Sequence, residues 1–248
     1  MHRPLFAVVT AAGMGTRLGD QGPKALVDIA GRPMLAYALD IVIQLPNLGG
    51  IAITAPADAL DDFRMIADQA DSPAPVVVCA GGDTRALSVQ AGLAALGQIS
   101  PVAHTSEAIV LIHDAARCFT PLDQMLRVAR AVAAGCDAVT PAIAVTDTIT
   151  VAGAARTLPG EDGPVAIEEA GHTPPRATLR AVQTPQGFPG DVIWRAHTHP
   201  ATDVQVTDDV QMVVAHGGFA ALVPGCELAF KVTVPSDLDR AKRLVEAR

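Results

Sequence analysis

Apolar residues fall into short, uninterrupted runs rich in valine and isoleucine, and these runs recur at intervals along the chain. Those with the length of strands are Leu5–Thr10, Ile51–Thr54, Val76–Cys79, Ile109–His113 and Ala138–Thr140. A strand with one solvent-exposed face would alternate apolar and polar residues, and these runs do not. We therefore expect a sheet that is covered on both faces.

Segments with helical periodicity lie between these runs and after them. The pattern predicts helices over Pro33–Leu45, Ala57–Gln69, Arg85–Leu96, Pro121–Ala134, Pro189–His197, Asp208–Ala215 and Ser236–Ala247, and short strands around Ala221–Val223 and Ala229–Thr233. Pro33 and Pro121 suit a first helical turn, where a missing N–H costs nothing. Alternating strands and helices predict an α/β fold, with a mostly parallel sheet and helices on both faces.

The stretch 147–180 breaks this alternation. It is rich in glycine and proline, and strand-like pieces at Thr148–Val151 and Val165–Ile167 flank a Pro159–Pro164 turn. A connection of this length inside a compact domain is usually functional or disordered. We interpret it as a protruding hairpin arm inserted in a single domain, residues 1–248. A mobile surface insertion accounts for the pattern about equally well.

Composition narrows the classes of function. Half of the 248 residues are hydrophobic and the net charge is −8 without a run of lysine or arginine, so we expect no nucleic-acid partner. No apolar stretch is long enough to span a bilayer and no secretory signal is visible, so we expect no membrane partner either. The four cysteines form no CxxC pair and are expected to be free thiols in the cytoplasm.

The loop after the first strand carries candidate chemistry. It contains Gly13 and Gly15, then the cations Arg17 and Lys24. Backbone N–H groups of a glycine-rich turn approach phosphates closely, and cations among glycines suit a triphosphate whose charge rises during transfer. The glycine spacing matches neither a Walker A loop nor a dinucleotide fingerprint. The alternative is an ordinary loop between strand and helix.

A second glycine-rich segment, Gly81–Val89, follows the third predicted strand. Its two glycines would let backbone approach a planar base, and Asp83, Thr84 and Ser88 offer hydrogen bonds. The same residues also suit an ordinary helix N-terminus, because Asp and Thr are good N-caps.

Charged residues next to other apolar segments are further candidates. Asp114 ends the most apolar strand, at the edge where α/β sheets bind ligands, and could hold Mg²⁺; a local pair with Arg117 is equally consistent. Lys231 lies in an apolar segment and needs an anionic partner or a wet face. His197 and His199 read as a polar helix end rather than a metal site, because no cysteine or carboxylate ligand set accompanies them.

Several segments, taken in order, resemble the 2-C-methyl-D-erythritol 4-phosphate cytidylyltransferases of the non-mevalonate isoprenoid pathway. They are AAGMGTRLGDQGPKA, GGDTRALSVQAGL, IHDAAR, VTDTI, LRAVQTPQGF, TDD and FKVTVPSDL, between residues 11 and 238. Each is weak alone, but the ordered set is specific. The resemblance implies a Rossmann-like domain whose β-arm locks a homodimer. It also implies transfer of CMP from CTP to the acceptor phosphate with release of pyrophosphate and with Mg²⁺ as cofactor.

The resemblance also implies a role for each matching residue. Arg17, Lys24 and Lys231 would stabilise charge at the α-phosphate. The set that binds CTP would be Ala11, Ala12, Gly13, Gly15, Thr16, Gly82, Asp83 and Ser88. The set that binds the sugar-alcohol phosphate would be Asp114, Arg117, Thr148, Arg176, Thr184, Thr207 and Thr233, with Asp114 serving Mg²⁺ or the acceptor hydroxyls and Arg176 reaching the partner subunit.

The sequence departs from the family pattern at Ala25, Cys118, Val214 and Ala229, none of which removes a proposed phosphate ligand. These departures indicate a subfamily or a shifted acceptor. One alternative therefore keeps the chemistry and changes the acceptor to a pentitol phosphate such as ribitol 5-phosphate. Another is a nucleotide-binding regulatory module without turnover, and an oxidoreductase is disfavoured by the glycine spacing.

Overall fold

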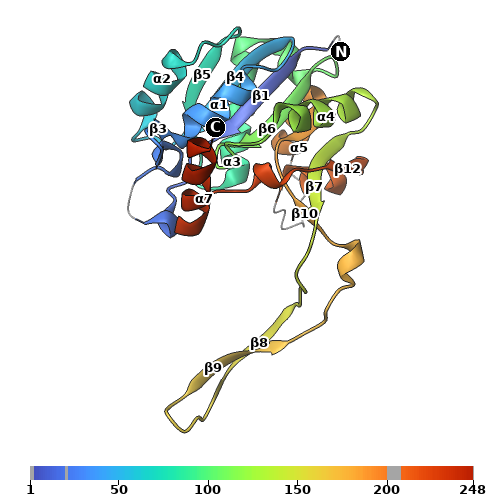
Figure 1. Ribbon diagram of the computed structural model, residues 1–248. Helices are drawn as coiled ribbons and strands as arrows, with labels where there is room; N and C mark the ends of the chain where they lie inside the picture. Colours follow the sequence, from blue (N-terminus) through green and yellow to red (C-terminus); the bar gives the residue numbers. More distant parts are fainter. Residues whose placement is uncertain (1–2, 20–21, 200–207, 248) are drawn as a thin grey trace.

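A single mixed sheet of eight strands forms the centre of the protein (Figure 1). The computed structural model describes residues 3–19, 22–199 and 208–247. The strands follow the order β10-β7-β11-β6-β1-β4-β5, and β12 pairs with β7. Their bounds are β1 Leu5–Thr10, β4 Leu48–Ala55, β5 Val76–Ala80, β6 Ile109–Asp114, β7 Ala138–Ala144, β10 Arg180–Val182, β11 Gln186–Pro189 and β12 Ala220–Pro224. A small separate ribbon joins β2 Asp28–Ile29 to β3 Arg32–Pro33.

Most strand pairs within the eight-stranded sheet are parallel, as the sequence predicts. β1 lies between β4 and β6 and is parallel to both, and β4–β5 and β7–β12 are parallel pairs. The exceptions are β11, antiparallel to β6 and β7, and β10, antiparallel to β7. The apolar pattern does not predict β10 and β11, because strands of three and four residues are too short for a clear periodicity.

Helices cover both faces of the sheet. Their bounds are α1 Met34–Val42, α2 Leu60–Gln69, α3 Arg85–Ile99, α4 Leu122–Ala133, α5 Gly190–Thr198, α6 Asp209–Ala215 and α7 Pro235–Glu246. Successive side chains of a strand point to opposite faces. Val9 of β1 accordingly packs in a cluster with α1, α2 and α4, whereas Val8 packs in a cluster with α3, α5 and α6. This arrangement confirms the doubly covered sheet and explains why β1 is apolar throughout.

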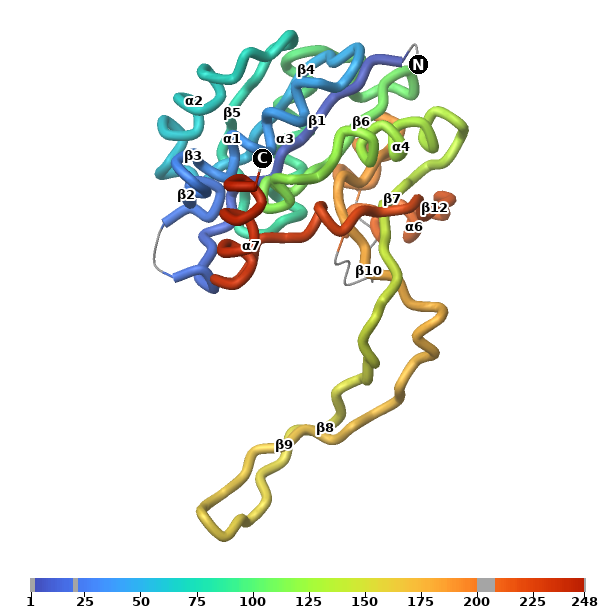
Figure 2. The backbone as a smooth tube through the Cα atoms, viewed as in Figure 1, coloured from blue at the N-terminus to red at the C-terminus, as the bar shows by residue number. Residues whose placement is uncertain are grey.

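A hairpin arm projects away from this sheet (Figure 1). Its strands, β8 (Ala152–Leu158) and β9 (Val165–Ala170), pair antiparallel, and nearly all of their residues are exposed. Arg180 of β10 pairs with Ala144 of β7, so the arm leaves the sheet and returns to it at neighbouring positions, as the path of the backbone in Figure 2 shows.

Two strand predictions are wrong. The first arm strand is not Thr148–Val151 but β8, because the residues next to the turn find their partner in β9. The segment Ala229–Thr233 is not a strand: a 3-10 turn, Glu227–Ala229, leads into an irregular stretch. There the Val232 N–H donates to the Ala116 carbonyl, which lies in the loop after β6. Within the described ranges, the helices are all too short or too polar to traverse a bilayer.

Candidate active site

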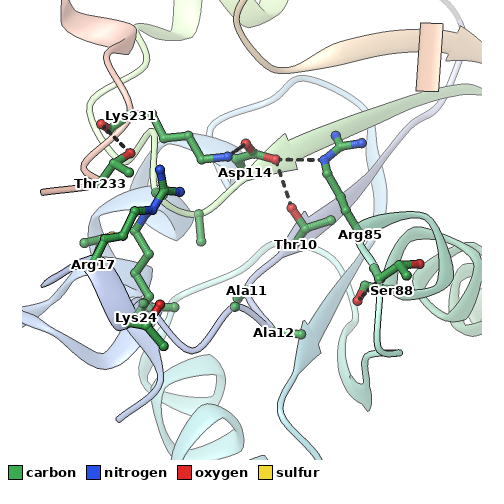
Figure 3. A pocket seen from close by; sticks show the side chains of 18 of the residues that line it. Thr10, Ala11, Ala12, Arg17, Lys24, Arg85, Ser88, Asp114, Lys231 and Thr233 are labelled. Atoms are coloured by element: carbon green, nitrogen blue, oxygen red, sulfur yellow. Dashed lines mark hydrogen bonds and ion pairs between the residues drawn. The ribbon is translucent and has the colours of Figure 1, made fainter. Parts of the chain in front are cut away.

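A cavity of about 320 Å³ opens where β1, β5 and β6 end (Figure 3). The carboxyl edge of a mostly parallel sheet is where α/β proteins bind ligands. Many of the predicted site residues line this cavity: Ala11, Ala12, Gly13, Gly15, Thr16, Arg17, Lys24, Gly82, Asp83, Ser88, Asp114, Lys231 and Thr233. These residues therefore lie together around one cavity, while the role of each of them stays a prediction.

The loop after β1 folds back on itself and so brings Lys24 to the cavity. The Lys24 N–H donates to the Gly13 carbonyl at 3.0 Å, and a short 3-10 turn at Thr16–Leu18 occupies part of the path between them. Gly15 has a φ of +67°, and a Cβ there would stand 2.7 Å from the Lys24 Cβ. Glycine is required at this position both for the left-handed backbone and for the close approach of the lysine.

Three cations converge on the cavity from two distant segments. Arg17 and Lys24 come from the loop after β1, and Lys231 from the stretch before α7. Burial lowers the pKa of Lys24 to about 8, with further lowering by Lys231 and then by Arg17. The three cations therefore repel one another, and a bound polyanion would relieve this repulsion.

Asp114, at the end of β6, is the anion among these cations. Lys231 and Arg85 reach its carboxylate from opposite sides in Figure 3. Its Oδ2 lies 2.7 Å from Lys231 Nζ, and its Oδ1 accepts from Thr10 Oγ1 at 3.1 Å and lies 3.4 Å from Arg85 Nε. Burial by itself would raise the pKa of Asp114, but Lys231 and Arg85 outweigh it and hold that pKa well below its usual value. Lys231 thus has the anionic partner that its sequence context requires.

Arg117 is engaged elsewhere, which resolves the alternative of a local pair with Asp114. Its guanidinium donates to the carbonyls of Ala229 and Val182, at 2.7 and 3.2 Å. Burial lowers the pKa of Arg117, and the negative charge of Asp114 offsets this lowering in part. Arg117 therefore ties the loop after β6 to two other segments and does not line the cavity.

The segment after β5 is both a helix N-terminus and a wall of the cavity. The Thr84 hydroxyl caps α3 by accepting from the Leu87 N–H at 3.2 Å. The buried Ser88 hydroxyl accepts from the Gly82 N–H and donates to the Thr84 carbonyl, at 3.2 and 3.0 Å. Ser88 thus fixes the shape of the loop, while Asp83 stays exposed on the lining of the cavity.

The other predicted acceptor-binding residues do not line the cavity of this chain. Thr184 is buried, and its hydroxyl accepts from the Asp114 N–H at 3.1 Å. Thr148 and Arg176 are exposed in the arm, where Arg176 donates to the Thr146 carbonyl at 2.8 Å. Thr207 lies outside the described residues.

The four departures from the family pattern leave the charged groups of the cavity unchanged. Ala25 is buried and lines the cavity. Cys118 and Ala229 are buried away from its lining, and burial raises the pKa of the Cys118 thiol to about 12. Val214 is exposed on α6.

Two polar residues of the cavity, Arg85 and Thr10, were not singled out from the sequence. Arg85 had a readable signal, because a cation in the first turn of a helix opposes the helix dipole and needs another reason to be there. The structure supplies this reason, because Arg85 forms ion pairs with both Asp114 and Asp209. Thr10 gave no signal beyond its place at the end of a strand.

The donor groups fit Mg²⁺ only in part. The described residues contain no group of three or more His, Cys, Asp or Glu side chains that could hold a metal ion. Mg²⁺ usually needs just one or two carboxylates, because substrate phosphates and waters complete its shell. Asp114 is a buried carboxylate on the cavity wall and Asp83 an exposed one, so the cavity fits an ion carried mainly by a triphosphate.

Comparison with known sequences agrees with this geometry. The family model described as 2-C-methyl-D-erythritol 4-phosphate cytidylyltransferase matches residues 5–247. The enzyme of that name from Streptomyces avermitilis is 41% identical over 244 residues, which cover 98% of this chain and 92% of the relative. The Rhodococcus jostii enzyme of the same name is 38% identical and covers 98% of this chain and 96% of its own.

Solved structures show the same fold. The 4-diphosphocytidyl-2C-methyl-D-erythritol synthase of Anaerococcus prevotii aligns with a TM-score of 0.76 at 26% identity, covering 98% of this chain and 96% of that one. The 2-C-methyl-D-erythritol 4-phosphate cytidylyltransferase of Thermus thermophilus aligns with a TM-score of 0.68 at 29% identity, covering 99% of this chain and all of that one. The fold, the cavity and the sequence matches agree, and this chain belongs to the 2-C-methyl-D-erythritol 4-phosphate cytidylyltransferase family.

Proposed function

We propose that this protein transfers CMP from CTP to 2-C-methyl-D-erythritol 4-phosphate and releases pyrophosphate, a step in isoprenoid precursor biosynthesis. Family membership over residues 5–247 supports the reaction. The observation in the structure that carries it is the convergence of Arg17, Lys24 and Lys231 on a glycine-lined cavity. Such a site suits the joining of two phosphate-bearing substrates.

The chemistry follows from the charges. An oxygen of the acceptor phosphate attacks the α-phosphorus of CTP in line with the leaving pyrophosphate. The acceptor phosphate is already ionised at neutral pH, so the site needs neither a general base nor a covalent intermediate. Its task is to bring two anions together. Arg17, Lys24 and Lys231 would offset their repulsion and stabilise the charge that develops at the α-phosphate.

Mg²⁺ belongs to the proposal as a cofactor. Asp114 would hold it together with the phosphates of CTP, and the ion would neutralise and orient the triphosphate when bound. Lys231 and Arg85 keep the carboxylate of Asp114 ionised, which is the form that an oxygen ligand of Mg²⁺ needs.

A homodimer formed through the arm is the second part of the proposal. The arm exposes the apolar side chains of Ile149, Val151, Leu158 and Val165, each by 44 to 53%. A two-fold contact with a second copy would bury these side chains on both chains at once. It would also carry Arg176 toward the partner's cavity, where a guanidinium could grip the acceptor phosphate in bidentate fashion.

The cytoplasm is the proposed location. All four cysteines, Cys79, Cys118, Cys136 and Cys226, are free thiols. This state fits a reducing compartment.

A pyrophosphate-release assay tests the reaction. It crosses CTP, UTP, ATP and GTP with 2-C-methyl-D-erythritol 4-phosphate, ribitol 5-phosphate and other sugar and polyol phosphates. We expect release with CTP and 2-C-methyl-D-erythritol 4-phosphate, because the family resemblance assigns Gly82, Asp83 and Ser88 to the binding of CTP. Equal release with ATP or GTP would refute the assignment of the base-binding segment. Preference for ribitol 5-phosphate would show that the acceptor is a pentitol phosphate. Binding of CTP without release of pyrophosphate would indicate a regulatory module.

A further inference from the structure

Arg85 bridges two carboxylates between the cavity and the protein interior. Its NH1 lies 2.6 Å from Asp209 Oδ2, and its Nε lies 3.4 Å from Asp114 Oδ1. The second oxygen of Asp209 lies 3.0 Å from His197 Nε2. The side chains of Asp209 and His197 are only 1% and 2% exposed, so the anchor of this bridge is fully enclosed.

Stability alone is a weak reason for such a bridge. Removing two charges from water costs free energy that their attraction often fails to repay, and well-packed apolar residues are often as stable at such a place. The position of Arg85 in the first turn of α3 adds a further cost, since a cation there opposes the helix dipole. Three helices also take part, because Asp209 begins α6 and His197 lies in the last turn of α5.

The bridge ends on the carboxylate that holds Lys231. Asp114 presents one oxygen to Lys231 and the other to Arg85 and Thr10. Contacts on both oxygens fix the rotation of the carboxylate, and with it the direction from which Lys231 is held. The charge of Arg85 also offsets part of the negative potential of Asp114, so the surroundings of Lys231 stay more favourable to a phosphate.

We propose that Arg85 is a positioning residue: anchored by Asp209 and His197, it holds Asp114, and through it Lys231, in the geometry that nucleotidyl transfer requires. The inference deepens the proposed function and rests on it. Asp209 and His197 are not on the lining of the cavity, so they act through Arg85 rather than on a substrate.

The test separates positioning from folding by removing the two charges singly and together. Asp209→Asn leaves Arg85 without its closest carboxylate, and Arg85→Gln leaves Asp209 without its guanidinium, so both single variants are expected to lose thermal stability. The double variant, Arg85→Gln with Asp209→Asn, replaces the ion pair by two neutral amides and is expected to regain most of the lost Tm.

The double variant should regain thermal stability but not turnover. We expect kcat of the double variant to stay about tenfold or more below that of the unmodified protein, because a small displacement of a reacting group is enough for such a loss. The KM for CTP should change much less than kcat. Arg85→Lys should give intermediate turnover, since an ammonium cannot grip both carboxylates as a guanidinium does.

Asp208→Asn is the matched control. Asp208 is the neighbour of Asp209 in sequence, but its Oδ1 caps α6 through the Gln211 N–H, and asparagine caps a helix equally well. We expect kcat to be unchanged. A double variant that regains both Tm and kcat would show that the bridge is structural and would overturn the inference.

A crystal structure of the double variant gives a readout that does not depend on turnover. We expect the Asp114 carboxylate to rotate and Lys231 Nζ, which it holds at 2.7 Å in the unmodified protein, to move with it. Unchanged positions of both side chains would contradict the inference even if the protein proved to catalyse another reaction. Absence of CMP transfer by the unmodified protein, in contrast, would refute the proposed function and leave this structural result to decide on Arg85.

Discussion

Lys24 is half-buried and shares the cavity with Lys231 and Arg17, and these surroundings lower its pKa to about 8. Burial disfavours the ammonium form because it removes water, and the two neighbouring cations disfavour it by repulsion. Because this pKa is close to neutral pH, the protonation of Lys24 depends on the anion that binds in the cavity. A triphosphate would raise this pKa again and so fix the charge where the reaction needs it.

A pH profile follows from this pKa. The ammonium of Lys24 is present below about pH 8 and is lost as the pH rises through that value. Because kcat/KM for CTP reports the free enzyme, we expect it to decline above about pH 8. Lys24→Arg should abolish this decline, whatever its absolute rate, since arginine keeps its charge throughout. A flat profile between about pH 7 and 9 for the unmodified protein would contradict the role of the Lys24 charge.

Removal of the Lys24 side chain should affect the rate more than the affinity. A contact that strengthens in the transition state contributes to kcat, whereas uniform binding contributes to KM. We expect Lys24→Ala to lower kcat by on the order of a hundredfold, with a much smaller change in CTP binding measured by calorimetry. Lys242→Ala is the control, because Lys242 lies on α7 and does not line the cavity. Near-normal turnover of Lys24→Ala would rule out the proposed role.

At the scale of elements, the loop after β1 acts through its backbone. It turns back at Gly15, where the backbone is left-handed and a Cβ would stand only 2.7 Å from the Lys24 Cβ. The 3-10 turn Thr16–Leu18 then presents Arg17, and the chain returns to bring Lys24 beside Gly13. Glycine is therefore needed here for the placement of a cation as well as for approach to phosphates.

Gly15→Ala tests this placement. Alanine pays roughly 1–2 kcal/mol for the left-handed conformation, and its methyl group also pushes against Lys24. We expect a modest loss of stability together with a clear loss of kcat. Gly31→Ala is matched, because Gly31 has a φ of +88° but open space around its Cβ position. Gly15→Ala should lose at least as much Tm as Gly31→Ala in thermal melts, but only Gly15→Ala should lose kcat. Equal kcat in both would argue against a link between Gly15 and Lys24.

At the scale of the whole molecule, contacts within one chain do not explain how the arm is stabilised. Its strands pair with each other, nearly all of their residues are exposed, and the two strands form a sheet of their own. An isolated two-stranded hairpin is marginal in water. The predicted acceptor-binding residues Thr148 and Arg176 also lie away from the cavity of this chain. A second copy would account for both observations.

Subunit mixing tests whether the site is shared. Arg176→Ala chains and Lys24→Ala chains should each be inactive, and subunit exchange between them should restore part of the activity. One of the two sites in each mixed dimer would then combine an intact Lys24 with an intact Arg176. Sedimentation verifies the dimer, and Arg180→Ala, a change at a neighbouring exposed arginine, is the control that should stay active alone. Verified exchange without recovery, or a monomer in sedimentation, would refute the shared site.

Local pattern in the sequence was enough for most of the elements and for most of the cavity lining. Uninterrupted apolar runs such as Leu5–Thr10 predict strands that are covered on both sides, because successive residues of a strand face opposite layers. Glycines next to Arg17 and Lys24 indicated a phosphate site, since few other structures need that combination. The short antiparallel strand β11 escaped prediction because four residues carry too little periodicity.

Tertiary structure alone decided which charges meet. Lys231 lies 117 positions from Asp114, and Arg85 lies 124 positions from Asp209, so neither pair has a local signature. The strand that carried Lys231 in the sequence-based prediction is absent, and the lysine instead reaches Asp114 from an irregular stretch. The lowered pKa of Lys24 depends likewise on burial and on neighbours brought together by the order of the strands. The physical reason is range: periodicity records which face of an element is buried, whereas electrostatic contacts depend on which elements become neighbours in space.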